Sequence, residues 1–177
     1  MKLAKRLAAA AGVVVLLAGC ASGNPNDVAV VNGQSITQAQ IDAVTPAVVA
    51  ILPPTSARTA SLSITNAWLQ AKVAKVVADA NGVTVSDIQR QQVIASSQTL
   101  AKIAEDPAAK DFVNALADQS VIAAQMSSEA FIDGVQDVSV TVNPRFGTWS
   151  GPDYALMPNG GALSKLAPAT ATASTNG

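Results

Sequence analysis

The sequence predicts an α+β domain that is mostly helical, with a small antiparallel sheet that joins its N-terminal and C-terminal strands. Three observations predict this fold. Residues 28–37 carry a hairpin signal, residues 38–134 place apolar residues mainly at helical spacing, and after Gly134 the apolar residues recur at every second position. With 177 residues, the chain is long enough for one domain with a buried core.

The N-terminal hairpin is predicted from VAVVNGQSIT, which spans residues 28–37. Residues 28–31 are strand formers, and Asn32-Gly33 is the pair most typical of a two-residue hairpin turn. A short return strand follows at residues 35–36. The folded part of the chain is therefore expected to open with two paired strands.

The first helix is expected to begin after Thr37. Gln40 lies three residues beyond Thr37, and this pair has the spacing of a capping box, in which each side chain bonds the other residue's backbone. Pro46 lies inside the apolar pattern that follows, so a kink or a break is expected there. Pro53-Pro54 is expected to end the helix.

Three further helical stretches follow before the chain changes its period. A long helix is expected from about residue 59 to residue 80, where apolar residues form one stripe. The next helix begins at Ser86, which has a glutamine three residues later. Asp106-Pro107 has the cap-then-proline order of a helix start, and a single helical run is expected from there to Gly134.

The last predicted element is a strand at Val138, Val140 and Val142, which alternate with polar residues. A lone strand would leave its backbone groups unpaired. The only other strand candidates lie in residues 28–37. The two ends of the domain are therefore expected to meet in one sheet.

We assign six residues to this closure and call them the closure residues: Asn32, Gly33, Pro144, Arg145, Phe146 and Gly147. Arg145 has two interpretations. Its planar guanidinium could clamp a carboxylate of a bound polypeptide. Alternatively, it could bond helix-end carbonyls or an aspartate while Phe146 or Trp149 stacks on it. The second interpretation is favoured because this segment must turn out of a strand and fix the chain against the hairpin.

Residues 1–19 have the composition of an export signal. Lys2, Lys5 and Arg6 precede an uncharged, largely apolar run. An ordinary transmembrane helix needs roughly 20 apolar residues, so this run is too short to span the membrane. The sequence therefore predicts a cleaved signal peptide at residues 1–19.

The segment that ends at Cys20 reads Leu-Ala-Gly-Cys and resembles a bacterial lipobox. The resemblance implies cleavage before Cys20 and attachment of a diacylglycerol and further acyl chains, palmitate among them, to that residue. Such a protein would be a lipoprotein anchored at the extracytoplasmic face of the cell membrane, with residues 20–27 as a tether. The alternative is an ordinary secretory signal with Cys20 as a bystander.

The domain is expected to span residues 28–151. From Pro152 no hydrophobic period survives, and the stretch to Gly177 is rich in Ala, Thr, Ser, Pro and Gly. Residues 152–177 are therefore predicted to form a flexible tail.

The composition argues against several classes of function. Loss of the three cations in residues 1–19 takes the formal net charge from −1 to −4, which disfavours nucleic acid as a partner. The sequence has no histidine and one cysteine, so the commonest general base and thiolate metal clusters are excluded. No phosphate-binding glycine loop or hydrolase motif occurs. We therefore expect no enzyme activity, no metal and no cofactor.

Three segments together resemble the N-terminal domain of the SurA and PrsA family of exported chaperones and foldases. They are VAVVNGQSIT followed by QAQID, then ANGVTVSDIQ, and finally VTVNPRFGTW. Their order matches the family over most of residues 28–149. Full-length relatives carry a parvulin prolyl-isomerase domain with histidines, which this sequence does not contain. The resemblance implies a chaperone domain for protein folding, without isomerase activity.

The function expected from this resemblance is binding of unfolded or exported polypeptides near the membrane. Trp68 and Trp149 are the candidate polypeptide-binding residues, because a tryptophan is a frequent anchor at interfaces. Trp68 has the competing interpretation of an ordinary core residue on an apolar helix stripe. The alternative function is a structural or assembly subunit of a cell-envelope complex with one fixed protein partner. A degenerate isomerase or hydrolase is the third hypothesis.

Overall fold

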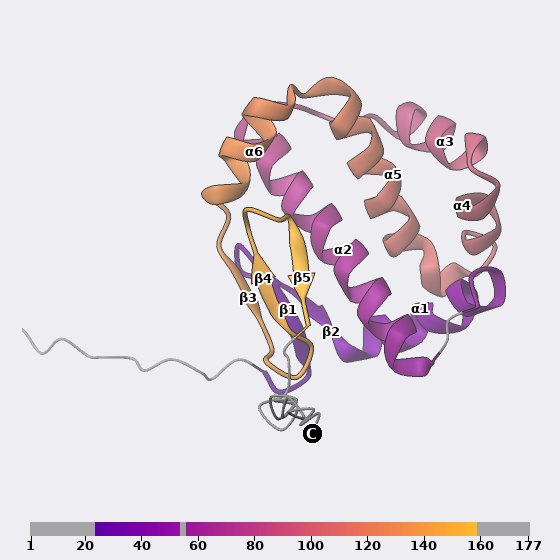
Figure 1. Cartoon of the computed structure of the whole chain (residues 1–177). Helices are drawn as coiled ribbons and strands as arrows, with labels where there is room; N and C mark the ends of the chain where they lie inside the picture. The colour runs from indigo at the N-terminus through magenta and orange to yellow at the C-terminus, as the bar shows by residue number, and fades with distance from the viewer. Residues whose placement is uncertain (1–23, 54–55, 159–177) are drawn as a thin grey trace, which may run out of the picture.

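The computed structural model describes residues 24–53 and 56–158, and within them the chain forms the predicted, mostly helical α+β fold. The helices pack around one long central helix, and the strands gather at one side of the molecule (Figure 1). The helical elements are α1 (Gln38–Ile51), α2 (Ala57–Ala80), α3 (Asp87–Ser96), α4 (Gln98–Ile103), the 3-10 turn η1 (Pro107–Ala109), α5 (Lys110–Gln125) and α6 (Ser128–Gln136).

A three-stranded antiparallel sheet joins the two ends of the domain, which confirms the predicted closure. Its strands are β1 (Asp27–Val31), β2 (Gln34–Thr37) and β3 (Val140–Val142), in the order β2-β1-β3. β1 is central, and Val30 lies opposite both Ser35 and Thr141. Strands more than a hundred residues apart in sequence therefore satisfy each other's backbone groups.

Helix starts follow the side-chain signals in the sequence. Both capping boxes form, at Thr37 with Gln40 and at Ser86 with Gln89. The sequence predicted a kink or a break at Pro46. The helix is not broken there, and α1 continues to Ile51. Pro46 and Asp42, whose carbonyl would otherwise accept from the backbone N–H at position 46, are both exposed residues of α1.

The prediction of one continuous helix from Asp106 to Gly134 is wrong. It is divided into η1, α5 and α6, with a break at Met126 and Ser127. Both residues of the break have extended backbone, and the Ser127 hydroxyl accepts a hydrogen bond from the backbone N–H of Ala130 at 3.3 Å. A serine that can cap a helix competes with helix continuation, and here the cap forms.

The tail predicted from Pro152 is wrong for residues 152–158. A C-terminal hairpin is formed by β4 (Thr148–Ser150) and β5 (Ala155–Met157), which pair with Trp149 opposite Leu156. The turn between them is Gly-Pro-Asp-Tyr, and the N–H of Tyr154 donates to the carbonyl of Gly151 at 3.1 Å. The folded domain also starts one residue earlier than expected, because Asp27 belongs to β1.

The core lies between the sheet and the helices, and α2 is its centre. α2 packs against α1, α5 and α6, and its buried face includes Leu69, Val73 and Val77. The strands contribute Val28, Val31 and Ile36. Few aromatic residues are present, so small aliphatic side chains provide most of the apolar area that is removed from water.

None of the helices in the described ranges combines the length and the apolar character that a membrane crossing requires.

Candidate functional site

A pocket of about 380 Å³ lies between α5, α6 and the C-terminal hairpin, and it is the candidate site of this chain. We call it the α6 pocket. Its volume is at the lower end of the roughly 300–1,000 Å³ typical of ligand sites. Its lining residues are Gln119, Ala123, Met126, Ser127, Ser128, Phe131, Ile132, Val135, Gly151, Pro152 and Tyr154.

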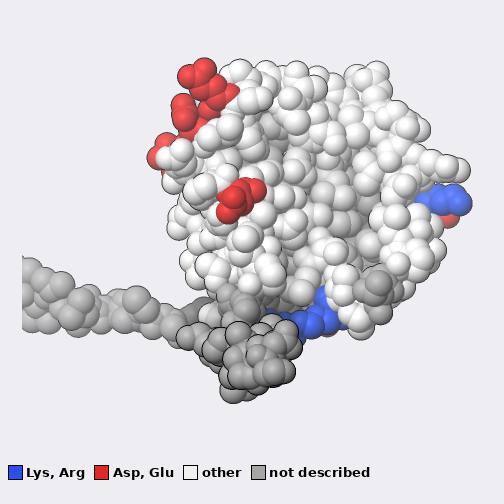
Figure 2. Space-filling model, viewed as in Figure 1, with Lys and Arg blue, Asp and Glu red and all other residues white. Residues whose placement is uncertain are grey.

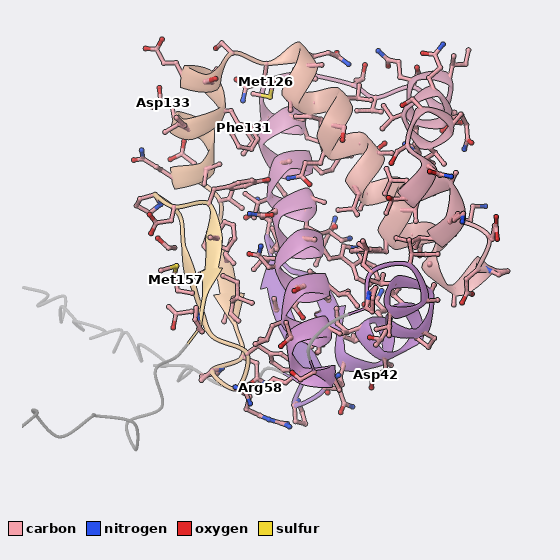
Figure 3. The ribbon with its side chains drawn as sticks, turned by 45° about the vertical axis from the view of Figure 1, so that its right-hand side comes forward. Asp42, Arg58, Met126, Phe131, Asp133 and Met157 are labelled. Atoms are coloured by element: carbon pink, nitrogen blue, oxygen red, sulfur yellow. The ribbon has the colours of Figure 1, made fainter. Side chains whose placement is uncertain are left out.

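The inner wall of the pocket comes from the break between α5 and α6. Because α5 ends at Gln125 and Ser127 caps α6, the chain turns here and places Met126 and Phe131 between the two helices (Figure 3). Val135 is buried one turn further along α6. Ile132 is 58% exposed and forms the rim. The pocket thus has a buried apolar wall and an accessible apolar edge.

Gly134 sets the position of α6 on α2. A Cβ atom on Gly134 would lie 2.5 Å from Cγ1 of Val77, which is closer than two carbon atoms approach. The absent side chain lets α6 pack tightly against the C-terminal part of α2, where Val77 lies. This close packing fixes α6 on α2, and so it fixes the position of the pocket wall that α6 forms.

The opposite wall is the hairpin turn, and Tyr154 is its main side chain. Tyr154 has φ of 48°, in the left-handed region that side chains other than glycine rarely occupy. Its ring makes edge contacts with Phe131, at 5.1 Å between centroids, and with Trp149, at 5.6 Å. The three rings form a cluster that fixes the hairpin against α6.

Two hydrogen bonds hold the Tyr154 hydroxyl in place. It donates to the backbone carbonyl of Gln70 on α2 and accepts from Nε2 of Gln119 at 3.3 Å. Burial raises the pKa of the phenol well above its ordinary value, and the hydrogen bond from Gln119 acts in the opposite direction. Tyr154 is therefore neutral at physiological pH, and none of the lining residues carries a charge.

The chemistry of the pocket is binding by burial of apolar surface. A bulky apolar side chain placed there would contact Met126, Phe131 and Ile132 and would leave water, which is favourable. Within residues 24–53 and 56–158, no three acidic or cysteine side chains lie close enough to share a metal ion. The lining offers hydroxyl and amide groups for orientation.

Trp68 is not a binding residue, which corrects the sequence-based assignment. It is 3% exposed, and its ring lies 5.4 Å from that of Phe112 in the core. Trp149 is half-buried in β4 and does not line the α6 pocket. The Trp149 ring packs against the ring of Tyr154, so Trp149 supports a residue of the pocket wall and does not itself act as a surface anchor.

The first two closure residues form the β1–β2 turn. Asn32 and Gly33 have φ of 44° and 81°, the left-handed backbone that a two-residue turn between twisted strands requires. Asn32 also bonds the other end of the chain. Its N–H donates to the carbonyl of Ser139 at 2.9 Å, and its side-chain oxygen accepts from the N–H of Ser139 at 2.9 Å.

The remaining closure residues form the turn from β3 into β4. The N–H of Phe146 donates to the carbonyl of Asn143 at 2.9 Å, and the N–H of Arg145 donates to the Asn143 side chain at 3.1 Å. Pro144 lies between them in an exposed turn. Gly147 has φ of 141°, and a Cβ there would collide with the carbonyl oxygen of Met157. Gly147 thus permits the approach of β5.

The side chain of Arg145 does not have the expected role. It is exposed, and no ion pair or ring contact involves it among the described residues. The turn is held by Asn143 instead, whose side-chain amide donates to the carbonyl of Asp27 at 3.2 Å. An asparagine that begins a turn can accept from turn backbone groups with its own side chain, so the exposed side chain of Arg145 is not needed to hold the turn.

The residues that form the pocket were not recognised in the sequence. Two signals were available. In Met126-Ser127-Ser128 a capping serine interrupts a helical period, and Gly151-Pro152-Asp153 is a turn sequence between Trp149 and Tyr154. Cys20 lies outside the described residues. Comparisons with models of protein families, with curated proteins and with solved structures found no match for this chain.

Proposed function

We propose that this chain is a chaperone-like protein that binds apolar segments of unfolded or exported polypeptides at the extracytoplasmic face of the cell membrane. The observation that carries the proposal is the α6 pocket. It is uncharged, it is open to solvent, and its rim residue Ile132 is more than half exposed.

The lining suits polypeptides of varied sequence. Met126 has a flexible and polarizable side chain that adapts to different shapes, and the edges of Phe131 and Tyr154 provide broad apolar contacts. A pocket of this size accepts one or two side chains at a time, so single contacts are weak and exchange readily. Weak, readily reversible binding is what a protein that holds unfolded chains requires.

The anchor in this proposal is the lipid on Cys20, and its support is the lipobox resemblance. Binding would need neither ATP nor covalent chemistry, since burial of apolar surface supplies the free energy. We expect a prolyl-isomerisation assay on a short peptide to give the uncatalysed rate.

The direct test is suppression of aggregation of a reduced, unfolded client by the full chain in lipid nanodiscs. Ile132→Asn is expected to weaken suppression because it places a polar group at the pocket rim. Ile88→Asn is the matched control, because Ile88 is also an exposed helix residue, at 73%, but lies on α3. No suppression by the wild-type chain at molar excess would refute the proposal.

A fixed partner is the second candidate, and the small size of the pocket favours it. A pocket of about 380 Å³ fits a defined side chain better than a long unfolded segment. This alternative predicts one stoichiometric partner after crosslinking in membranes, together with no general effect on client aggregation.

A further inference from the structure

The outer face of α6 carries a row of carboxylates beside the α6 pocket. Glu129, Asp133 and Asp137 are spaced four residues apart, so their side chains lie along one stripe of the helix. All three are exposed, and no Lys or Arg pairs with them in the part of the chain that the structure describes. We call them the acidic row.

The acidic row does not stabilise α6. Like charges four residues apart on a helix repel each other. Asp137 lies at the C-terminal cap, where the partial negative charge of the helix end opposes a carboxylate. Only Glu129, in the first turn, interacts favourably with the helix dipole. Stability of the helix therefore does not explain this arrangement, and a cationic partner would relieve its repulsion.

The acidic row is continuous with the pocket rim. Glu129 follows the lining residue Ser128, and Asp133 follows Ile132, which places Ile132 between the pocket and the carboxylates. Figure 3 shows Asp133 on the outer side of α6, away from Phe131. Asp153 adds an exposed carboxylate in the hairpin turn across the pocket.

The surroundings contain few compensating cations. Between Asp111 and Pro144 the sequence has no Lys or Arg. In Figure 2 most acidic atoms lie at the left, over α6 and over the hairpin turn, with an uncharged surface between them. The basic atoms on this face lie at the right and lower edges, and further acidic atoms lie beside those at the right. The charged side chains nearest the pocket are therefore mainly acidic, an arrangement that favours cationic ligands.

We propose that the α6 pocket selects polypeptide segments in which a bulky apolar side chain is flanked by Lys or Arg. This inference rests on the proposed function and specifies its ligand. The apolar side chain enters beside Ile132 and Phe131, and the flanking cations reach the acidic row. Long flexible Lys and Arg side chains span the distance between an apolar contact and a nearby carboxylate.

The test uses three labelled peptides with the same Leu-Phe centre and flanks of Lys, Ser or Glu. Their affinity for the full chain in neutral lipid nanodiscs is measured by fluorescence anisotropy. The Lys-flanked peptide is expected to bind about fivefold or more tightly than the Ser-flanked peptide, and the Glu-flanked peptide most weakly. High salt should reduce these differences.

Two variants assign the preference to its residues. The triple variant E129Q/D133N/D137N is expected to remove the advantage of the Lys-flanked peptide and to leave the Ser-flanked peptide unchanged. The variant D42N/E105Q/D111N removes the same charge from other exposed positions and is expected to retain the preference. Circular dichroism of both variants checks that the helices are intact.

Each outcome separates the two proposals. Equal affinity for all three peptides overturns the selection of cationic segments and leaves binding at the pocket standing. A preference for Lys that survives E129Q/D133N/D137N also overturns the inference, because other charges would then cause it. Failure of every peptide to bind overturns both the inference and the proposed function.

Discussion

Gln70 and Tyr154 bond each other twice across 84 residues of sequence. Nε2 of Gln70 donates to the backbone carbonyl of Tyr154 at 2.6 Å, and the Tyr154 hydroxyl donates to the backbone carbonyl of Gln70. This reciprocal pair ties the turn of the C-terminal hairpin to the middle of α2. It maintains Tyr154 in a left-handed backbone conformation and so holds one wall of the α6 pocket in place.

The first prediction concerns stability at high pH. The pKa of Tyr154 is raised in the folded state, whereas an unfolded tyrosine ionises near pH 10, so only the unfolded chain loses this proton just above pH 10. The contribution is complete below that pH and is lost as the pH rises toward the folded pKa. The free energy of unfolding should fall by at most about 1.4 kcal/mol per pH unit.

The matched variant for this prediction is Tyr154→Phe. It should lower the free energy of unfolding by about 1–2 kcal/mol at neutral pH, because both hydrogen bonds of the hydroxyl are lost. It should also flatten the dependence above pH 10, which urea denaturation measures. Tyr154 is the only tyrosine, so tyrosinate absorbance reports its ionisation directly. Ionisation near pH 10 in the folded protein would contradict the structure.

The second prediction tests the close contact between α6 and α2. Gly134→Ala should destabilise the protein by about 1–2 kcal/mol, even though alanine favours helix by about 1 kcal/mol, because the new methyl group collides with Val77. Val77→Ala in the same chain should recover part of the loss. A double-mutant cycle by chemical denaturation measures the coupling, and additive effects would refute the contact.

The third prediction uses the buried hydroxyl of Thr65. Thr65 is fully buried, and its Oγ1 has no hydrogen-bond partner among the described residues. Thr65→Val keeps the shape and removes the unpaired polar group, so it should raise the free energy of unfolding by about 1 kcal/mol. Thr45→Val is the control. Its hydroxyl donates to the carbonyl of Ile41 at 2.7 Å, so its loss should bring no gain in thermal stability.

The fourth prediction separates two neighbouring closure residues. Gly147→Ala should cost about 2 kcal/mol or more, because φ of 141° and the carbonyl of Met157 both exclude a Cβ atom. Arg145→Ala should change the free energy of unfolding by less than about 0.5 kcal/mol, because its side chain is exposed. Thermal melting of both variants checks this, and a large loss from Arg145→Ala would restore the structural role inferred from sequence.

Local signals in the sequence predicted most of the elements. Asn32-Gly33 defines its turn by backbone preference alone, and the pairs Thr37–Gln40 and Ser86–Gln89 define helix starts within four residues. The pairing of β1 with β3 was predicted because a lone C-terminal strand would leave its backbone groups without hydrogen-bond partners. These inferences succeeded because each depends on contacts close in sequence or on a single possible partner.

The candidate site depends on contacts that leave no local pattern. The burial of Tyr154 depends on Gln70 and Phe131, which lie 84 and 23 residues away. The strands of the C-terminal hairpin have three residues each, too short for a visible alternation. For Trp68 the local pattern was visible but ambiguous. An aromatic residue on an apolar helix stripe can pack in the core or bind a ligand, and the sequence does not distinguish the two.

Site-specific photocrosslinking tests the central proposal most directly. A photoreactive phenylalanine analogue is placed at Ser128, which lines the α6 pocket, or at Ala43, an exposed position on α1 outside it. The full chain in nanodiscs is then irradiated with an unfolded, labelled client. We predict crosslinks from position 128 that an excess of a leucine-rich peptide competes away, and only background from position 43. Equal crosslinking from the two positions would contradict binding at the α6 pocket.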